Sequence, residues 1–140
     1  MSNIVYLGLG SNLGDRRKNI DQALQLLTRQ RVTPLVLSSV LETVPQGGPP
    51  QGLYLNAVLK AETLLSPERL LEVVLGIEAD LGRVRTEKNG PRVIDIDILL
   101  YSDLVLETPL LTIPHPRMLE RDFVMCPLRE VFPDFSPETR

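Results

Sequence analysis

The segment Val93-Ile94-Asp95-Ile96-Asp97-Ile98-Leu99 alternates isoleucine and aspartate at its centre. Successive side chains of a β-strand point to opposite faces, so the three isoleucines share one face while Asp95 and Asp97 share the other. The pattern predicts a strand over residues 93–101 that has one face in a core and two carboxylates on the opposite face. Any fold proposed for this chain must bury one side of that strand only.

The remainder of the chain supplies three more strands and two helices. Apolar runs bounded by turn residues predict strands over residues 4–7, 35–43 and 54–63. Apolar residues at helical spacing predict one helix from Asp15 onward and a second that is capped by Ser66 and stopped by Gly82. Shorter extended pieces at 104–107 and 110–113 and a helical turn from Pro116 complete the prediction.

The predicted order is strand, helix, strand, strand, helix, strand. This order is typical of the ferredoxin-like βαββαβ sandwich, an α+β fold in which helices pack on an antiparallel sheet. No linker, repeat or low-complexity tract divides the sequence, so we expect a single domain over residues 1–140.

Composition limits the class of partner. The formal net charge is −3, so we do not expect a nucleic-acid partner held by bulk charge, although local arginines could still bind an anionic small molecule. The N-terminus lacks the pattern of a signal peptide, and no segment approaches the roughly 20 apolar residues of a membrane helix. One cysteine, Cys126, lies in an apolar stretch where we expect a buried structural thiol. These features predict a soluble, cytoplasmic protein.

The two aspartates are candidate metal ligands. Their Cα atoms would lie about 6.6 Å apart along a strand. Two carboxylates this close on one face repel each other unless a cation lies between them, and Mg²⁺ prefers oxygen ligands. The alternative is an ordinary strand with its polar face in water. Aspartate is disfavoured in strands, and Arg92 stands just ahead of the pair, which favours the metal site.

Positive charges gather immediately before this strand, at Arg83, Arg85, Lys88 and Arg92. Arginine binds phosphate in a bidentate manner and offsets charge as a phosphorus–oxygen bond breaks. Cations beside paired carboxylates would suit a nucleotide–metal complex. The alternative is a solvated basic loop.

Three further features are less specific. His115 lies between two prolines, so its imidazole could donate to a phosphate or belong to a surface turn. Arg121 and Phe123 could flank a ligand, although Phe123 could equally pack in the core. The glycines at 8, 10 and 14 do not match a dinucleotide fingerprint, because the third is one place late. The chain also has no Gly-Lys-Ser/Thr phosphate loop.

The run from Lys88 to Leu99 resembles the signature of the hydroxymethyldihydropterin pyrophosphokinase family. The resemblance continues in the same order over nearly the whole chain, through residues 10–13, 54–57, 78, 82–85, 114–115 and 121–123. Some positions depart from the family pattern. Asn89 stands where some relatives have a tryptophan in a basic loop that is also slightly longer, and Val44 and Pro116 replace a frequent proline and a frequent tyrosine.

The resemblance implies a pyrophosphokinase domain that transfers pyrophosphate from ATP to the hydroxymethyl group of 6-hydroxymethyl-7,8-dihydropterin, releasing AMP, in folate biosynthesis. Asp95 and Asp97 would bind two Mg²⁺ ions, and Arg83 and Arg92 would assist the transfer. Residues implied to bind ATP are Glu78, Arg85, Arg92, Ile98, Thr112, His115 and Arg121. Residues implied to bind the pterin are Thr43, Val44, Pro45, Gln46, Tyr54, Asn56 and Phe123.

ATP and the pterin would be the partners of a monomeric enzyme, with neither nucleic acid nor membrane involved. Two alternatives stay open. One is a phosphotransferase that moves only the γ-phosphate, and the other is a non-catalytic ferredoxin-like module that binds a nucleotide. Formation of AMP rather than ADP would separate the pyrophosphokinase from the first, and turnover would separate it from the second.

Overall fold

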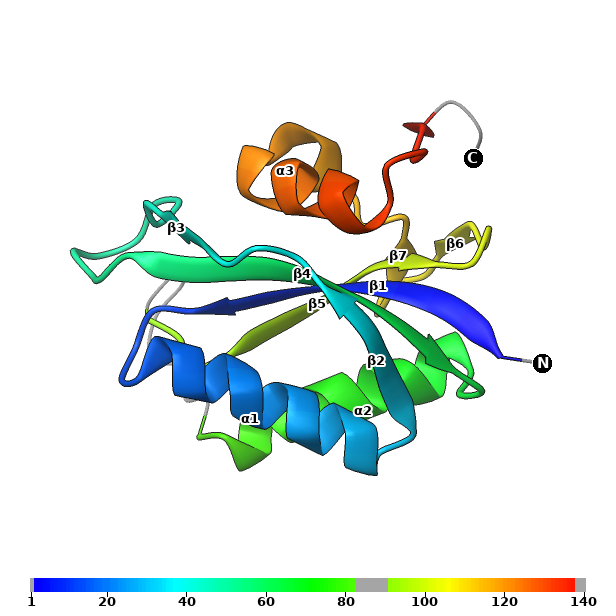
Figure 1. Cartoon of the computed structure of the whole chain (residues 1–140), viewed down its shortest axis with the longest axis horizontal. Helices are drawn as coiled ribbons and strands as arrows, with labels where there is room; N and C mark the ends of the chain where they lie inside the picture. The colour runs from blue at the N-terminus through cyan, green and yellow to red at the C-terminus, as the bar shows by residue number, and fades with distance from the viewer. Residues whose placement is uncertain (1, 83–90, 138–140) are drawn as a thin grey trace.

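A computed structural model, which describes residues 2–82 and 91–137, shows an antiparallel sheet between two layers of helices (Figure 1). The order across the sheet is β2-β4-β1-β5, and β3 also pairs with β4. The strands are β1 (Asn3–Ser11), β2 (Val32–Leu37), β3 (Leu41–Thr43), β4 (Tyr54–Thr63) and β5 (Asp95–Tyr101). Together with helices α1 (Arg16–Arg29) and α2 (Pro67–Asp80), this arrangement confirms the predicted ferredoxin-like fold.

Both predicted helices are present, and the second begins and ends for the reasons that the sequence indicates. The Asp15 carboxylate accepts a hydrogen bond from the Lys18 amide at the start of α1. At the start of α2, Ser66 accepts from the Arg69 amide and Pro67 occupies the first turn. Beyond the end of α2, Gly82 has a φ of 88°, a left-handed conformation that glycine adopts without strain.

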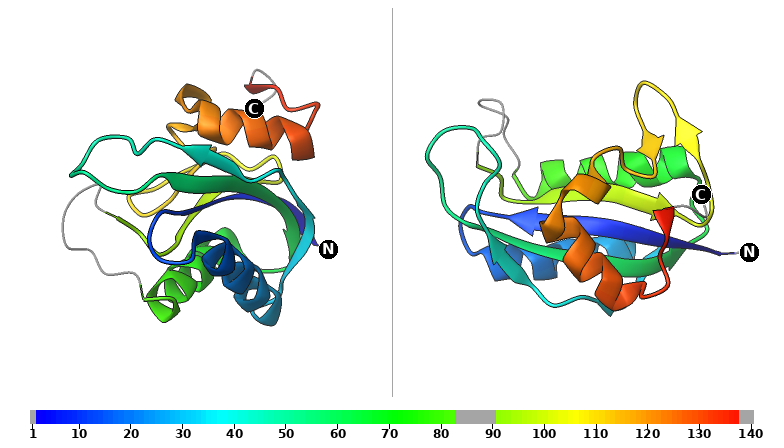
Figure 2. Two further views of the ribbon diagram at one scale, coloured as in Figure 1. Left: turned by 60° about the vertical axis from the view of Figure 1, so that its left-hand side comes forward. Right: turned by 90° about the horizontal axis from the view of Figure 1, so that it is seen from above.

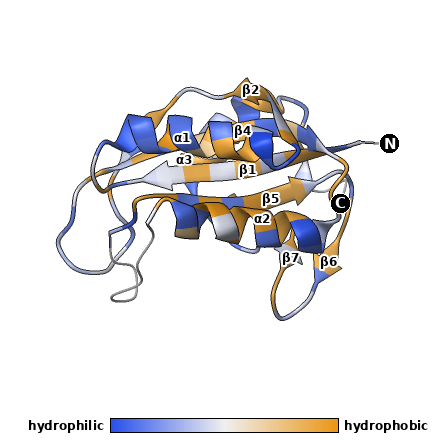
Figure 3. Ribbon diagram, turned by 90° about the horizontal axis from the view of Figure 1, so that it is seen from below, coloured by the Kyte–Doolittle hydropathy of each residue, from blue (hydrophilic) through white to orange (hydrophobic). Residues whose placement is uncertain are grey.

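Helices α1 and α2 lie side by side on one face of the sheet (Figure 3). The outer side of α1 is mostly hydrophilic, whereas β5 is hydrophobic apart from Asp95 and Asp97 near its start. Side chains from alternate positions of β1 and β5 point into this layer and bury the helices' apolar faces. Its buried members include Val5, Leu7, Leu9, Ile20, Leu27, Leu70, Val74, Ile77, Ile94, Ile96 and Ile98.

Helix α3 (Asp122–Val131) lies across the opposite face of the sheet (Figure 2). Val124, Met125 and Leu128 point into a second apolar cluster that also contains Val58 and Leu99 from the sheet. The sequence analysis did not predict this helix, which contains Pro127 in its interior. Positions 124, 125 and 128 share one helical face, and Cys126 falls on the other. The expectation of a buried Cys126 is therefore wrong, because its side chain is exposed.

Several predicted strand boundaries are also wrong. Strand β1 does not end at Gly8 but continues through Gly10 to Ser11, because both neighbouring strands pair with it there. The expected strand over 35–43 is divided into β2 and β3. At the division, the Ser38 amide donates to the Val58 carbonyl, and the Ser38 hydroxyl accepts from the Val58 amide at 2.8 Å. The Ser38 hydroxyl thus replaces a backbone carbonyl as the acceptor for the Val58 amide, and the hydrogen-bond ladder along β4 is interrupted between β2 and β3.

The segment after β5 matches the prediction in outline. Strands β6 (Leu106–Glu107) and β7 (Thr112–Ile113) form a small hairpin within the extended pieces, and a short 3₁₀ helix, η1 (Met118–Glu120), corresponds to the predicted turn. Strand β5 begins at Asp95, two residues later than expected. Among the described helices, none is both long enough and apolar enough to cross a bilayer.

Replacing Ser38 by alanine should destabilise the protein by about 1–3 kcal/mol, because the buried Val58 amide would lose its acceptor. Chemical denaturation followed by circular dichroism measures this free energy of unfolding. Ser39→Ala is the matched control, since Ser39 is exposed and its backbone amide would still donate to Glu130. Equal losses for the two variants would contradict a special role for Ser38.

Candidate active site

The strand β1 forms the floor of a cavity of about 140 Å³ between the sheet and α3. Gly8 and Gly10 are on the face of the strand that points to this cavity, so no side chain fills the cavity at these two positions. A Cβ atom on Gly10 would lie 2.8 Å from Asn56 Oδ1 and 3.4 Å from the Tyr54 ring. Because glycine has no Cβ atom, the side chains of Asn56 and Tyr54 of β4 can pack directly against the backbone at Gly10.

The walls of this first cavity come from β4, α3 and the segment that follows β3. The Asn56 amide nitrogen donates to the Thr43 hydroxyl at 2.5 Å, so its oxygen is the end turned toward Gly10. Tyr54 lines the cavity from the sheet and Phe123 lines it from the first turn of α3. The Arg121 guanidinium lies 5.6 Å from the centre of the Phe123 ring, within cation–π range. The cavity therefore combines aromatic walls with fixed polar groups, as ligand sites commonly do.

Asp95 and Asp97 stand at one side of the same cavity. In the sheet register Asp95 is opposite Gly10 and Asp97 is opposite Gly8, so both carboxylates flank the glycine floor. The predicted sharing of one face is confirmed, since Ile96 and Ile98 are buried beneath the helices. Arg92 Nη1 lies 3.7 Å from Asp95 Oδ1. The side chain of Arg92 is 13% exposed and that of Asp95 is 34% exposed, so the pair is partly shielded from water.

A second cavity, of about 290 Å³, runs along the outer edge of β5 between α2 and the β6–β7 hairpin. Glu78 of α2 is only 4% exposed, and its carboxylate accepts a hydrogen bond from the Ile96 amide at 2.8 Å. Leu71 and Leu75 line this cavity one helical turn apart on the same face as Glu78. Asp95 and Asp97 line both cavities, so the two sites meet at the carboxylate pair.

His115 lines the second cavity and is held by two backbone contacts. Its amide donates to the Leu99 carbonyl, and its Nδ1 atom accepts from the Arg117 amide at 3.3 Å. Burial lowers the pKa of His115 below the usual 6.5; Asp97 opposes this change, whereas Arg121 and Arg117 reinforce it. The lowered pKa favours the neutral imidazole, and the Arg117 amide at Nδ1 favours the tautomer with its proton on Nε2.

The structure gathers the predicted site residues into two groups that share Asp95 and Asp97. Those lining the first cavity are Thr43, Val44, Pro45, Gln46, Tyr54, Asn56, Arg92, Arg121 and Phe123. Those lining the second are Glu78, Ile98, Thr112 and His115. Arg121, which the resemblance assigns to ATP, thus lines the cavity predicted for the pterin. Arg83, Arg85, Lys88 and Asn89 lie outside the described residues.

Sequence reasoning missed several lining residues. Gly8 predicts the end of a strand, and Gly8 and Gly10 were otherwise considered only as a nucleotide-loop motif, although their alternate spacing within a strand indicates an open face. Leu71 was assigned only to helix packing and Leu75 to no role, yet their spacing from Glu78 places all three on one side of α2. The hairpin residues 108–111 carry no sequence signal for a site.

The pair of carboxylates fits a divalent cation that is completed by ligand oxygens. Among the residues that the structure describes, no group of three or more His, Cys, Asp or Glu side chains gathers in one place. Mg²⁺ is commonly bound by one or two carboxylates together with substrate phosphates rather than by a cage of protein ligands. Asp95 and Asp97 therefore offer the donor set expected for Mg²⁺ in a nucleotide complex.

Comparison with known proteins identifies the family. The sequence profile of the 7,8-dihydro-6-hydroxymethylpterin-pyrophosphokinase (HPPK) family matches residues 6–133. The chain belongs to this family. It is 46% identical over 132 residues to the 2-amino-4-hydroxy-6-hydroxymethyldihydropteridine pyrophosphokinase of Bacillus subtilis, a match covering 94% of this chain and 79% of that protein. Membership in the HPPK family confirms the resemblance and favours an enzyme over a non-catalytic module.

The chain also matches part of some longer proteins. The chain is 46% identical over 138 residues to the folic acid synthesis protein FOL1 of Dictyostelium discoideum, covering 99% of this chain and 21% of that protein. A crystal structure of an HPPK-DHPS in complex with substrates has the same fold, with a TM-score of 0.73 at 16% identity, and the match covers 100% of this chain and 42% of that one. The chain thus spans 21% of the first of these proteins and 42% of the second.

Gly10→Ala should displace the Asn56 amide, because the new methyl group would lie 2.8 Å from Oδ1 of a side chain that Thr43 holds. Gly8→Ala is the matched control, since its Cβ would meet only ordinary contacts of 3.6 Å and longer. We expect a lower melting temperature and a shifted Asn56 side-chain amide resonance for Gly10→Ala alone. The same displacement of Asn56 in both variants would contradict this account of the floor.

His115 should titrate below pH 6.5 in the folded protein, and NMR of its ring protons measures the pKa. Because the unfolded chain binds the proton more readily, this residue should make the protein less stable as the pH falls through 6.5. Asp97→Asn should lower the pKa of His115 further, and Arg121→Ala should raise it. A pKa at or above 6.5 in the unsubstituted protein would refute the prediction.

Proposed function

We propose that this protein transfers pyrophosphate from ATP to the hydroxymethyl group of 6-hydroxymethyl-7,8-dihydropterin and releases AMP, as one pyrophosphokinase domain over residues 1–140. The observation that carries the proposal is the arrangement of two distinct cavities that share Asp95 and Asp97. A reaction between a nucleotide and a second substrate needs two adjacent sites with the charge-stabilising groups at their junction. Family membership supplies the identity of the substrates.

The pterin would occupy the first cavity, stacked between Tyr54 and Phe123. A flat heteroaromatic ring gains from contact with aromatic faces, and its polar edge requires fixed hydrogen-bonding partners. Asn56 and the segment 43–46 would provide those partners, since Thr43 already orients the Asn56 amide.

ATP would occupy the second cavity, with its adenosine between α2 and the β6–β7 hairpin. Leu71, Leu75 and Leu111 offer apolar contact, and Ile98 and Thr112 line the same space. The triphosphate would then extend from the cavity across Asp95 and Asp97 toward the pterin. The neutral His115 keeps an Nε2 proton available for donation to a phosphate oxygen. Arg85 is assigned to ATP by the resemblance alone.

In the proposed reaction the hydroxymethyl oxygen forms a bond to the β-phosphorus and gives up its proton. The bond between the β-phosphorus and the oxygen that bridges it to the α-phosphorus breaks, and AMP leaves with that oxygen. Arg92, partly shielded beside Asp95, and Arg121 would offset the charge that develops on the phosphates. Arg83 would assist by the same chemistry. Two Mg²⁺ ions held by Asp95 and Asp97 would, when bound, neutralise phosphate charge and polarise the phosphorus–oxygen bonds.

The decisive experiment incubates the protein with ATP, Mg²⁺ and the reduced pterin alcohol and resolves the nucleotides formed. AMP together with the pterin pyrophosphate supports the proposal, whereas ADP indicates transfer of the γ-phosphate alone. Absence of turnover under conditions where both ligands bind would indicate a binding module. Size-exclusion chromatography of the same sample tests the proposal that the enzyme is monomeric. We also propose that the enzyme acts in the cytoplasm.

Asp95→Asn and Asp97→Asn should each retain the fold and lose most of the activity. The substitution preserves shape but removes a charge from the proposed metal site, and both side chains face a cavity rather than the core. Initial rates of AMP formation across a range of Mg²⁺ concentrations measure the effect, and thermal unfolding checks the fold. A rate near that of the unsubstituted protein in either variant would rule out the metal assignment.

A further inference from the structure

Asn12 lies just after β1 and is only 6% exposed, and its backbone amide and both polar atoms of its side chain form hydrogen bonds with other segments. Its backbone amide donates to the Arg92 carbonyl at 3.0 Å, and its Oδ1 accepts from the Arg92 amide at 2.8 Å. Its Nδ2 donates to the Gly52 carbonyl at 3.0 Å and to Gln51 Oε1 at 2.8 Å. One buried side chain therefore holds two segments that are far apart in the sequence.

The two segments held by Asn12 carry groups from different sides of the first cavity. Arg92 precedes β5 and contacts Asp95. Gln51 and Gly52 belong to the connection from β3 to β4, which leads directly into Tyr54. This connection and the start of α1 lie at the same end of the sheet in Figures 1 and 2. A shift of Asn12 would therefore move an arginine near the carboxylates and the entry to the aromatic wall together.

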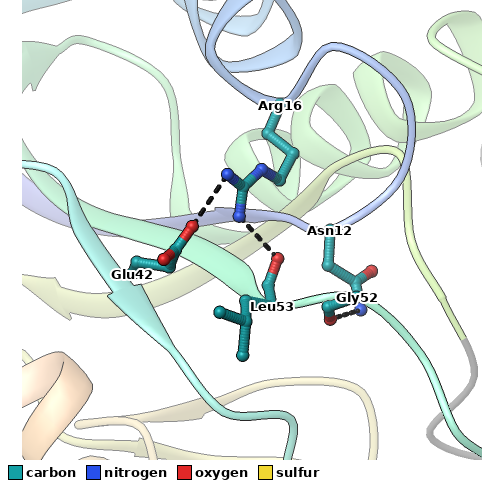
Figure 4. Close-up of polar contacts among 5 residues, drawn as sticks. All are labelled: Asn12, Arg16, Glu42, Gly52 and Leu53. Atoms are coloured by element: carbon teal, nitrogen blue, oxygen red, sulfur yellow. Dashed lines mark hydrogen bonds and ion pairs between the residues drawn. The ribbon is translucent and has the colours of Figure 1, made fainter.

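Arg16 adds a second tie to the same connection (Figure 4). Its guanidinium donates to the Leu53 carbonyl and pairs with Glu42, both at 2.9 Å. The first turn of α1 contains Arg16, Arg17 and Lys18 and no acidic residue, the opposite of what the helix dipole favours. The contacts of Arg16 explain a cation at that place. Unlike Asn12, Arg16 has no contact with Arg92 among the described interactions, so it serves as a control.

We propose that Asn12 is a positioning residue that couples the β3–β4 connection to Arg92 and so sets the geometry for pyrophosphate transfer. The inference rests on the proposed function. Asn12 lines neither cavity, and both of its amide hydrogens and its oxygen are committed to the chain itself. It acts through the backbone position of Arg92 and through the path of residues 51–53. Small misplacements of reacting groups can cost large factors in rate, which is why such a residue matters.

Two substitutions separate the two halves of the coupling. Asn12→Asp keeps an acceptor for the Arg92 amide but cannot donate to Gly52 or Gln51. Asn12→Ala removes both sets of side-chain contacts. We expect faster amide hydrogen exchange at residues 51–53 in both variants, and faster exchange at Arg92 mainly in Asn12→Ala. We also expect kcat to fall about tenfold to a hundredfold in Asn12→Ala, with the KM for ATP changed less than about twofold.

Arg16→Ala and Arg17→Ala provide controls on the same helix. Arg16→Ala should speed exchange near Leu53 without affecting the Arg92 amide. Arg17→Ala should change neither, because among the described residues the polar partner of Arg17 is the exposed Asp21. Exchange that rises equally throughout β1 and β4 in Asn12→Ala would indicate general destabilisation and overturn the proposal. So would an unchanged kcat in that variant. The exchange measurements need no substrate, so they test the coupling even if the unsubstituted protein fails to form AMP.

Discussion

The pairing of β1 with a neighbour on each side determines where every group of the site lies. Gly10 is opposite Asn56 on one side and Asp95 on the other, and Gly8 is likewise between Val58 and Asp97. Val5, Leu7 and Leu9 point to the other face and join the core beneath α1 and α2. A shift of one residue in this register would bury the carboxylates among apolar side chains and expose the leucines. The core and the site are therefore fixed by the same hydrogen bonds.

The parts of the structure that could be predicted are those in which local pattern and tertiary packing agree. The alternation around Asp95 and Asp97 survives in the fold because Ile96 and Ile98 have a helix layer to pack against. Ser66 caps α2 as expected, since capping depends only on neighbouring residues, and α1 begins after Asp15 as expected. The roles assigned to Tyr54, Asn56 and Phe123 came from the family resemblance, and the fold brings these three residues to one cavity.

The parts that could not be predicted depend on contacts between distant segments. The apolar, β-branched run over 35–43 gives no sign that the Ser38 hydroxyl will replace a carbonyl opposite Val58. Helix α3 is short and contains Pro127, and it is stabilised by packing on a sheet that the local sequence does not reveal. Gly8 and Gly10 suggest the end of a strand when considered alone. They belong to one because β4 and β5 both pair with β1 there, and at Gly10 the missing side chain also leaves space for Asn56 and Tyr54.

Strand β5 is the last strand of its sheet, and its outer side is closed by groups that also belong to the site. The Glu78 carboxylate accepts a hydrogen bond from the Ile96 amide, and the His115 amide donates one to the Leu99 carbonyl. An edge strand with open backbone groups is a template on which another chain can add a strand and begin to aggregate. The carboxylates of Asp95 and Asp97, beside an edge capped in this way, oppose such an addition. The groups that we propose for binding ATP therefore also oppose strand addition at this edge, and variants that neutralise them should be handled as aggregation risks during purification.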